Sequence, residues 1–259
     1  MENIESYSAA EKKCEDETIL ALKQPIEINE ELFEFYLKIS KKYCGGMPKS
    51  NVRPFALIVL NHRILKSTRC LSTLLKRGQY AEFHSILRDV FEALSKSEFF
   101  LSHPESSHAW LKGEKITFSK ISKKLSLPDS LNQLYGELCN FTHANIQSIF
   151  WEITVYPKKI EPNFRIVSMS YEPVFFKPIA YSLIMFLIDF TIYAINSYFI
   201  FIERYCSEID QEDKDQYYQL TKKLAAIDKD YSEFCSDPKN TEWRRKIKFN
   251  DSNPDNISF

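Results

Sequence analysis

The feature that most constrains this sequence is its most hydrophobic segment, which runs from Pro178 to about Cys206. Nearly every residue between 179 and 202 is apolar or aromatic. The exceptions are Ser182, Asp189, Thr191, Asn196 and Ser197. A helix that is apolar almost all the way round is buried, either in a protein core or in a bilayer. We therefore expect a central helix over about 178–206 that the amphipathic helices of the chain cover.

Two interpretations of this segment are possible: a core helix of a soluble protein and a membrane span. About 20 apolar residues suffice to cross a bilayer, so a membrane-associated protein that uses 179–202 is one alternative. Four polar residues recur every seven positions and form one narrow stripe: Ser182, Asp189, Asn196 and Glu203. This stripe favours a soluble bundle, where it touches water or faces Arg63 or Arg88 across the core. No cluster of Lys and Arg flanks the segment to orient a span, and we expect a cytoplasmic protein.

Composition and charge exclude several classes of function. Of the 259 residues 44% are apolar and 27% are charged, which is typical of a globular protein. The net charge of −1 provides no overall attraction to nucleic acid or to an anionic membrane. Glycine-rich phosphate loops, paired C-x-x-C motifs and metal-ligand spacings of His and Cys are absent from the sequence. We therefore expect no metal and no cofactor.

Shifts in composition divide the chain into three parts. Residues 1–26 are polar and acidic, lack the features of a signal peptide, and predict a loose lead-in, with a short helix over 18–23 before Pro25 as one alternative. Residues 27–235 carry the periodic apolar pattern and predict a single helical domain. Residues 236–259 are rich in Asn, Asp, Ser and Pro, and predict a disordered polar tail.

Apolar periodicity within the domain predicts its elements. Helical spacing predicts helices over about 28–39, 54–76, 80–101, 130–148 and 217–234, with two short pieces within 105–127. Gly78 provides a turn that makes the second and third of these antiparallel neighbours. Apolar and polar residues alternate twice within about 150–171, which predicts a β-hairpin. The fold class is mainly α: an antiparallel helical bundle around a central apolar helix, with one β-hairpin.

Two local patterns mark candidate functional residues. Arg88 and Glu92 are four residues apart on one predicted helix and share a face, with His84 one turn earlier. A second predicted helix places four residues on roughly one side: Tyr135, Cys139, Thr142 and His143. An ion pair between packed helices satisfies polar groups without catalysis. A structural polar network that includes Asp189 and Asn196 is therefore one interpretation, and a binding or catalytic site is the other.

These patterns resemble those of a known group of proteins. The stretch LLKRGQYAEFHSILRDVFEALSKSEFFL, followed some forty residues later by LYGELCNFTHANIQSI, resembles an uncharacterised family of bacterial helical proteins. It is more distantly similar to the HEPN-type helical domains of toxin and phage-defence systems. The resemblance covers roughly 71–150. It matches Arg88 and Glu92 to an R-x-x-x-E motif, and Tyr135, Cys139 and His143 to a Tyr, a small residue and a His.

The resemblance implies a homodimer that binds RNA or a protein partner and, if it is an enzyme, a metal-independent ribonuclease. Active HEPN ribonucleases carry an R-x4-6-H motif whose Arg and His act on the RNA phosphate and 2′-hydroxyl. Here that Arg is missing before His143, so Arg88 would have to supply the cation from the neighbouring helix. Arg77 and His84 have the right spacing but straddle Gly78. A non-enzymatic interaction or scaffold protein is therefore the alternative function.

Overall fold

The protein is described by a computed structural model that covers residues 4–44, 52–142, 153–156, 163–166, 173–237, 248–249 and 257–258. The helices are α1 (Ile4–Ala21), α2 (Lys23–Cys44), α3 (Val52–Lys76), α4 (Tyr80–Ser102), α5 (Pro104–Leu111), α6 (Phe118–Leu125), α7 (Asp129–Thr142), α9 (Pro173–Tyr205) and α10 (Gln211–Ser236). The strands are β1 (Ile153–Tyr156), β2 (Asn163–Ile166), β3 (Lys248–Phe249) and β4 (Ile257–Ser258). The predicted mainly α fold is confirmed.

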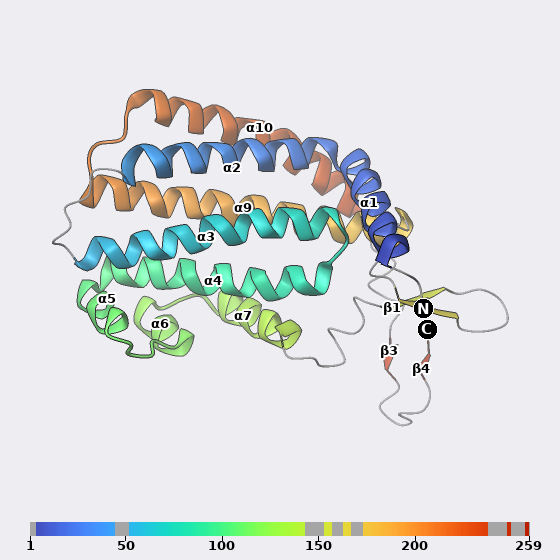
Figure 1. Ribbon diagram of the computed structural model, residues 1–259, viewed down its shortest axis with the longest axis horizontal. Helices are drawn as coiled ribbons and strands as arrows, with labels where there is room; N and C mark the ends of the chain where they lie inside the picture. Colours follow the sequence, from blue (N-terminus) through green and yellow to red (C-terminus); the bar gives the residue numbers. More distant parts are fainter. Residues whose placement is uncertain are drawn as a thin grey trace.

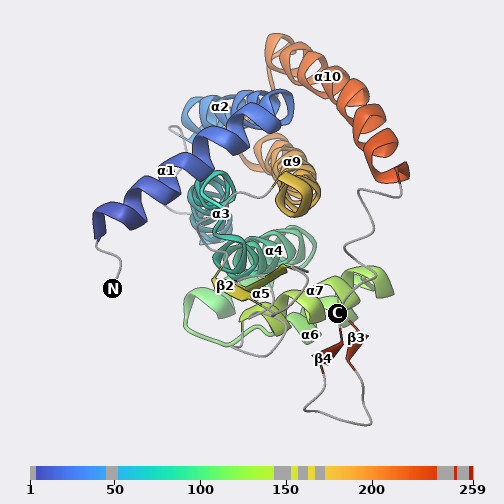
Figure 2. The ribbon, with the colours of Figure 1, turned by 90° about the vertical axis from the view of Figure 1, so that its right-hand side faces the viewer.

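The apolar helix α9 lies between the other long helices. It packs against α2, α3 and α4, which surround it on one side, while α10 lies further out (Figures 1 and 2). Its most deeply buried side chains are Ala180, Ile184, Leu187, Ile188, Ile195 and Ile202. The helix begins at Pro173, five residues before the predicted start at Pro178. Pro173 stands at the first helical position, which favours proline because the backbone N–H there has no intrahelical acceptor.

The prediction of a loose lead-in over 1–26 is wrong, because α1 and the start of α2 occupy this part of the chain. Cys14, Thr18 and Leu22 are buried and follow one another at intervals of four residues, which gives α1 a narrow packed side. The two helices are nearly continuous but change direction at Leu22 (Figure 1). Pro25 explains the break, since a proline cannot donate the backbone hydrogen bond to the residue four positions earlier.

Helices α3 and α4 form the antiparallel pair that the sequence predicts, with Gly78 at the turn. Gly78 has φ of 73°, a left-handed conformation that favours glycine. Its N–H donates to Leu75 O at 3.1 Å, and the Gln79 N–H donates to Leu74 O at 2.9 Å. These two bonds form a Schellman motif that ends α3. A side chain at Gly78 would also lie 2.8 Å from the Cys14 sulfur of α1.

Helices α5, α6 and α7 pack on α4, on the side away from α2 (Figure 2). The helix predicted over 130–148 is described as far as Thr142, and the rest of that prediction lies outside the described residues. Within the predicted hairpin region, β1 and β2 run antiparallel with Ile153 opposite Ile166. The connecting and flanking residues are outside the described residues, so a hairpin over about 150–171 stays a prediction. Most of the tail, 236–259, also lies outside the described residues, so its predicted disorder stays a prediction. Within it, β3 pairs with β4.

Helix α10 is attached to α2 through a buried carboxylate. Asp213 is fully buried, and its Oδ2 accepts hydrogen bonds from Lys42 Nζ and Tyr43 Oη, each at 2.7 Å. Its Oδ1 lies 2.9 Å from Lys38 Nζ. Burial alone would raise the pKa of Asp213, but the bonds to Lys42, Lys38 and Tyr43 outweigh it and lower the pKa to about 2. A buried charge needs such partners, so this cluster holds α10 in place.

We expect Asp213→Asn to lower the free energy of unfolding at pH 7 by about 2 kcal/mol, the equivalent of the lowered pKa. Because the folded-state pKa lies below the ordinary value of 3.8, this contribution is present above about pH 4. It is lost as the pH falls through about 2. The difference between wild type and variant should therefore shrink by about half at pH 3. Urea unfolding at both pH values measures it.

The matched control is Asp215→Asn, because Asp215 lies on the same helix but is exposed and bonds only to Gln211 among the described residues. We expect that substitution to change the free energy of unfolding by less than about 0.5 kcal/mol. Equal effects of the two substitutions would contradict the assigned role of Asp213.

Candidate functional site

The candidate site is a polar network between α4 and α7 that centres on one carboxylate. Arg88 Nη2 donates to Glu92 Oε1 at 3.1 Å, and Lys96 Nζ donates to Glu92 Oε2 at 3.2 Å. Tyr135 Oη, from α7, donates to Glu92 Oε1 at 2.9 Å. Three of the sequence-predicted residues, Arg88, Glu92 and Tyr135, therefore meet in space. The side chains of Arg88, Glu92 and Lys96 are 26%, 24% and 19% exposed, so solvent reaches the network at its edge.

Aromatic rings fix the position of Tyr135. Its ring stacks on Phe118 of α6 with the ring centroids 3.9 Å apart, and lies 6.1 Å from the ring of Phe91 on α4. The Arg88 guanidinium carbon lies 5.9 Å from the centroid of the Tyr135 ring, within range of a cation–π interaction. The hydroxyl group is thus held at Glu92 by packing as well as by its hydrogen bond.

The surroundings shift the pKa values of the network. Burial favours the neutral form of Glu92, but the Tyr135 hydrogen bond and the charges of Lys96 and Arg88 outweigh it, so the pKa is lowered. Burial and the bond to Glu92 raise the pKa of Tyr135 to about 12. For Arg88, burial opposes the charge, yet Cys139, Tyr135 and Glu92 together raise the pKa. At neutral pH the network therefore contains an ionised carboxylate, a neutral phenol and two cations.

His84 is buried one turn before Arg88, with its ring against Phe83. Its Nδ1–H donates to the Tyr80 carbonyl oxygen at 2.6 Å. Burial lowers the pKa of His84, partly offset by this hydrogen bond, so the ring is neutral at pH 7. The R-x6-H spacing from Arg77 does not create a shared helical site, since Arg77 lies beyond the end of α3.

The predicted catalytic residue His143 lies outside the described residues, immediately after the last described residue of α7, Thr142. Its expected convergence with Arg88 stays a prediction. Cys139, one turn after Tyr135, is partly buried and close enough to Arg88 and Tyr135 to influence the pKa of both.

The polar stripe of α9 lies elsewhere. Asp189 and Asn196 are exposed on the side of α9 that faces away from α3. The expectation that this stripe faces Arg63 or Arg88 is wrong. Arg63 binds Asp89 at 2.9 Å instead, and Arg88 binds Glu92. Asp189 has a second acid nearby, Asp228 of α10, and Asn196 lies near Tyr217 of α10.

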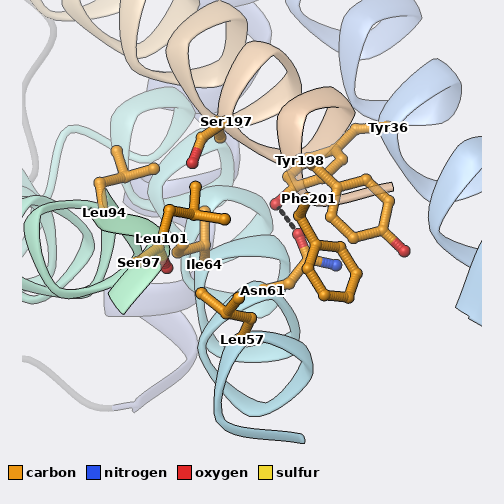
Figure 3. A pocket seen from close by; sticks show the side chains of 11 residues that line it. Tyr36, Leu57, Asn61, Ile64, Leu94, Ser97, Leu101, Ser197, Tyr198 and Phe201 are labelled. Carbon is orange, nitrogen blue, oxygen red and sulfur yellow. Dashed lines mark hydrogen bonds between the residues drawn. The ribbon is translucent and has the colours of Figure 1, made fainter. Parts of the chain in front are cut away.

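A small cavity lies among α2, α3, α4 and α9 (Figure 3). Its volume is about 10 Å³, which is room for about one water molecule and too small for a substrate. Asn61 is its main polar residue. The Tyr36 hydroxyl donates to Asn61 Oδ1, and Asn61 Nδ2 donates to Ser40 Oγ at 3.1 Å. These bonds link α2 to α3 at the edge of the cavity.

Sequence reasoning missed Lys96, although a signal for it was present. Lys96 follows Glu92 by four residues, the same spacing that identified Arg88, and so lies on the same helical face. Within the described ranges, no three His, Cys, Asp or Glu side chains come together in a way that suits a metal ion.

Comparisons of the chain with protein-family models, with curated proteins and with solved structures find no match. In the part of the chain that the structure describes, one helix is long and apolar enough to cross a membrane. It is the segment Ile179–Tyr205 of α9, with a mean hydropathy of 1.7. Half of its most apolar window is buried against the chain's own helices. A core helix of a soluble protein has the same properties, so a membrane association through 179–202 stays a prediction.

We expect Tyr135→Phe to lower the free energy of unfolding by about 1 kcal/mol, because the substitution removes the hydrogen bond to Glu92 and keeps the stacked ring. Chemical unfolding of wild type and variant measures this difference. Tyr218→Phe is the matched control, since Tyr218 is 57% exposed on α10. A loss in the control as large as in Tyr135→Phe would contradict the assigned role of the Tyr135 hydroxyl.

Proposed function

We propose that this chain is a HEPN-like helical module of a stress or defence system that binds a protein partner and does not catalyse a reaction. The observation that best supports this is the polar network on Glu92. Arg88, Lys96 and Tyr135 all bind this one carboxylate, and the Tyr135 bond holds α7 against α4. A network of this kind stabilises a helical bundle without any substrate.

The pKa shifts support a structural role. General acid–base catalysis is most effective when the pKa of the catalytic group lies near the working pH. Here the pKa values of Glu92 and His84 are lowered, and that of Tyr135 is raised to about 12. Each group therefore keeps a single protonation state near pH 7, which suits scaffolding and not proton transfer.

RNA binding with metal-independent cleavage by His143 and Arg88 is the second candidate function. One observation favours it: within the described residues, Arg88 Nε is buried and has no hydrogen-bond partner, which leaves one donor of the guanidinium unused. Helix α7 also carries the chain directly from Tyr135 toward His143. The cytoplasmic location, the homodimer and the hairpin over about 150–171 remain parts of the proposal in either case.

A ribonuclease assay separates the two functions. We expect the purified chain, in buffer with a metal chelator, to leave single-stranded and structured RNA intact. Arg88→Ala should lower the melting temperature by about 2–6 °C, because it removes about 1–2 kcal/mol of hydrogen bonding and packing. His143→Ala, assayed in parallel, tests the other predicted catalytic residue.

Metal-independent cleavage by wild type would contradict the proposed function if Arg88→Ala and His143→Ala abolish it and circular dichroism shows that both variants stay folded. Ser236→Ala at the end of α10 serves as the control for purity, since a contaminating nuclease would persist in all preparations.

A further inference from the structure

The side of α9 that faces away from α3 remains exposed. Six residues define this outer face: Phe186, Asp189, Tyr193, Asn196, Ile200 and Glu203. Its three large apolar members are 43%, 44% and 49% exposed, in the order Phe186, Tyr193 and Ile200. These three side chains recur every two turns on one face of α9, and large apolar side chains gathered on one exposed face often mark an interaction site.

Contacts on both sides place the outer face between α4 and α10 (Figure 2). On one side the Tyr193 hydroxyl donates to the Glu98 carboxylate of α4. On the other side, Glu203 lies 3.2 Å from Lys214 of α10. The two neighbouring helices thus border the face without covering it.

The spacing of the outer face fits a helical partner. Its members follow one another at intervals of three and four residues, which is the a/d spacing of a coiled-coil seam. Apolar residues occupy every seventh position at 186, 193 and 200, and polar residues alternate with them at 189, 196 and 203. An amphipathic helix binds such a seam with apolar residues at its own i, i+3, i+4 and i+7 positions.

The charges around the face specify the chemistry of that partner. Within the described residues, three acids at the face have no cationic partner: Glu98 of α4, Asp189 of α9 and Asp228 of α10, whereas Glu203 pairs with Lys214. Within the described part of the chain, neither Asp189 nor Asp228 has an ion-pair or hydrogen-bond partner. Desolvation and the charge of Asp228 raise the pKa of Asp189, so the two carboxylates repel each other. Cationic side chains placed here would relieve this repulsion.

The same charges disfavour other occupants. RNA carries a phosphate charge at each nucleotide and would be repelled by three carboxylates. A second copy of this chain would bring the same acids against one another across a twofold axis. A bilayer would have to accommodate Asp189 among hydrocarbon chains at a cost of several kcal/mol.

We infer that the outer face of α9 is a docking surface for a basic amphipathic helix of a partner protein. The apolar residues of that helix cover Phe186, Tyr193 and Ile200. Its Lys or Arg residues bind Asp189 and Asp228. This inference rests on the proposed function only in that it requires a protein partner, and it involves none of the residues of the Glu92 network.

A fluorescent 18-residue helical peptide of Leu and Lys, with Leu at a and d positions, is the probe. Fluorescence anisotropy with the full chain should give a micromolar dissociation constant, and a matched peptide with Glu in place of Lys should not bind. Asp189→Lys and Ile200→Ser should each weaken binding at least tenfold. Asp215→Lys, an equal charge reversal at an exposed position of α10, should leave the affinity within twofold.

Failure to bind the Leu/Lys peptide at 100 µM, or equal binding by all three variants, would overturn the inference. So would a wild-type dimer in sedimentation that Ile200→Ser converts to a monomer, because a second copy would then occupy the face. Circular dichroism checks that the variants are folded. The ribonuclease assay is independent of these results, so failure of the docking surface and failure of the proposed function are distinguishable.

Discussion

Burial of one side of α9 is the interaction on which the rest of the structure depends. Ile184, Leu187, Ile195 and Ile202 are essentially inaccessible to solvent. Each such side chain stabilises the folded state by about 1.5–3 kcal/mol relative to its exposed state. Helices α2, α3 and α4 supply the complementary apolar side chains, and the outer sides of α2 and α4 are in turn covered by α10 and by α5, α6 and α7. The bundle therefore forms because one helix is too hydrophobic to remain uncovered and three others are amphipathic.

The sequence predicts the strongly periodic helices well and the weakly periodic one poorly. Helices α3 and α4 lie within about two residues of their predicted bounds, because regular Leu and Phe positions and Gly78 mark them clearly. Helix α1 was missed because its packed side consists of Cys14, Thr18 and, just after the helix, Leu22. Only Leu22 of these is strongly apolar, so the sequence shows no clear difference between a buried and an exposed side. Tertiary contacts with α2 and α3 stabilise it, and a single sequence does not reveal those contacts.

Contacts of the candidate site between residues close in the sequence could be predicted, and contacts between separate helices could not. Arg88 and Glu92 are paired by helical spacing alone, whereas the contact with Tyr135 depends on how α7 packs against α4. The suggested pairing of the α9 stripe with Arg63 failed because a nearer acid, Asp89, is available on the adjacent helix. Which side of α9 stays open is likewise decided by the number of neighbouring helices and cannot be deduced from its own residues.

Helix α10 has a consequence for the dynamics of the protein. Its N-terminal half bonds to α2 through Asp213, Gln216 and Lys223, and it reaches α9 through aromatic side chains such as Tyr217 and Tyr231. Elements with few buried contacts open at a lower free energy than the core and exchange their amide hydrogens first. We therefore expect α10 to exchange its amide hydrogens before the centre formed by α2, α3, α4 and α9.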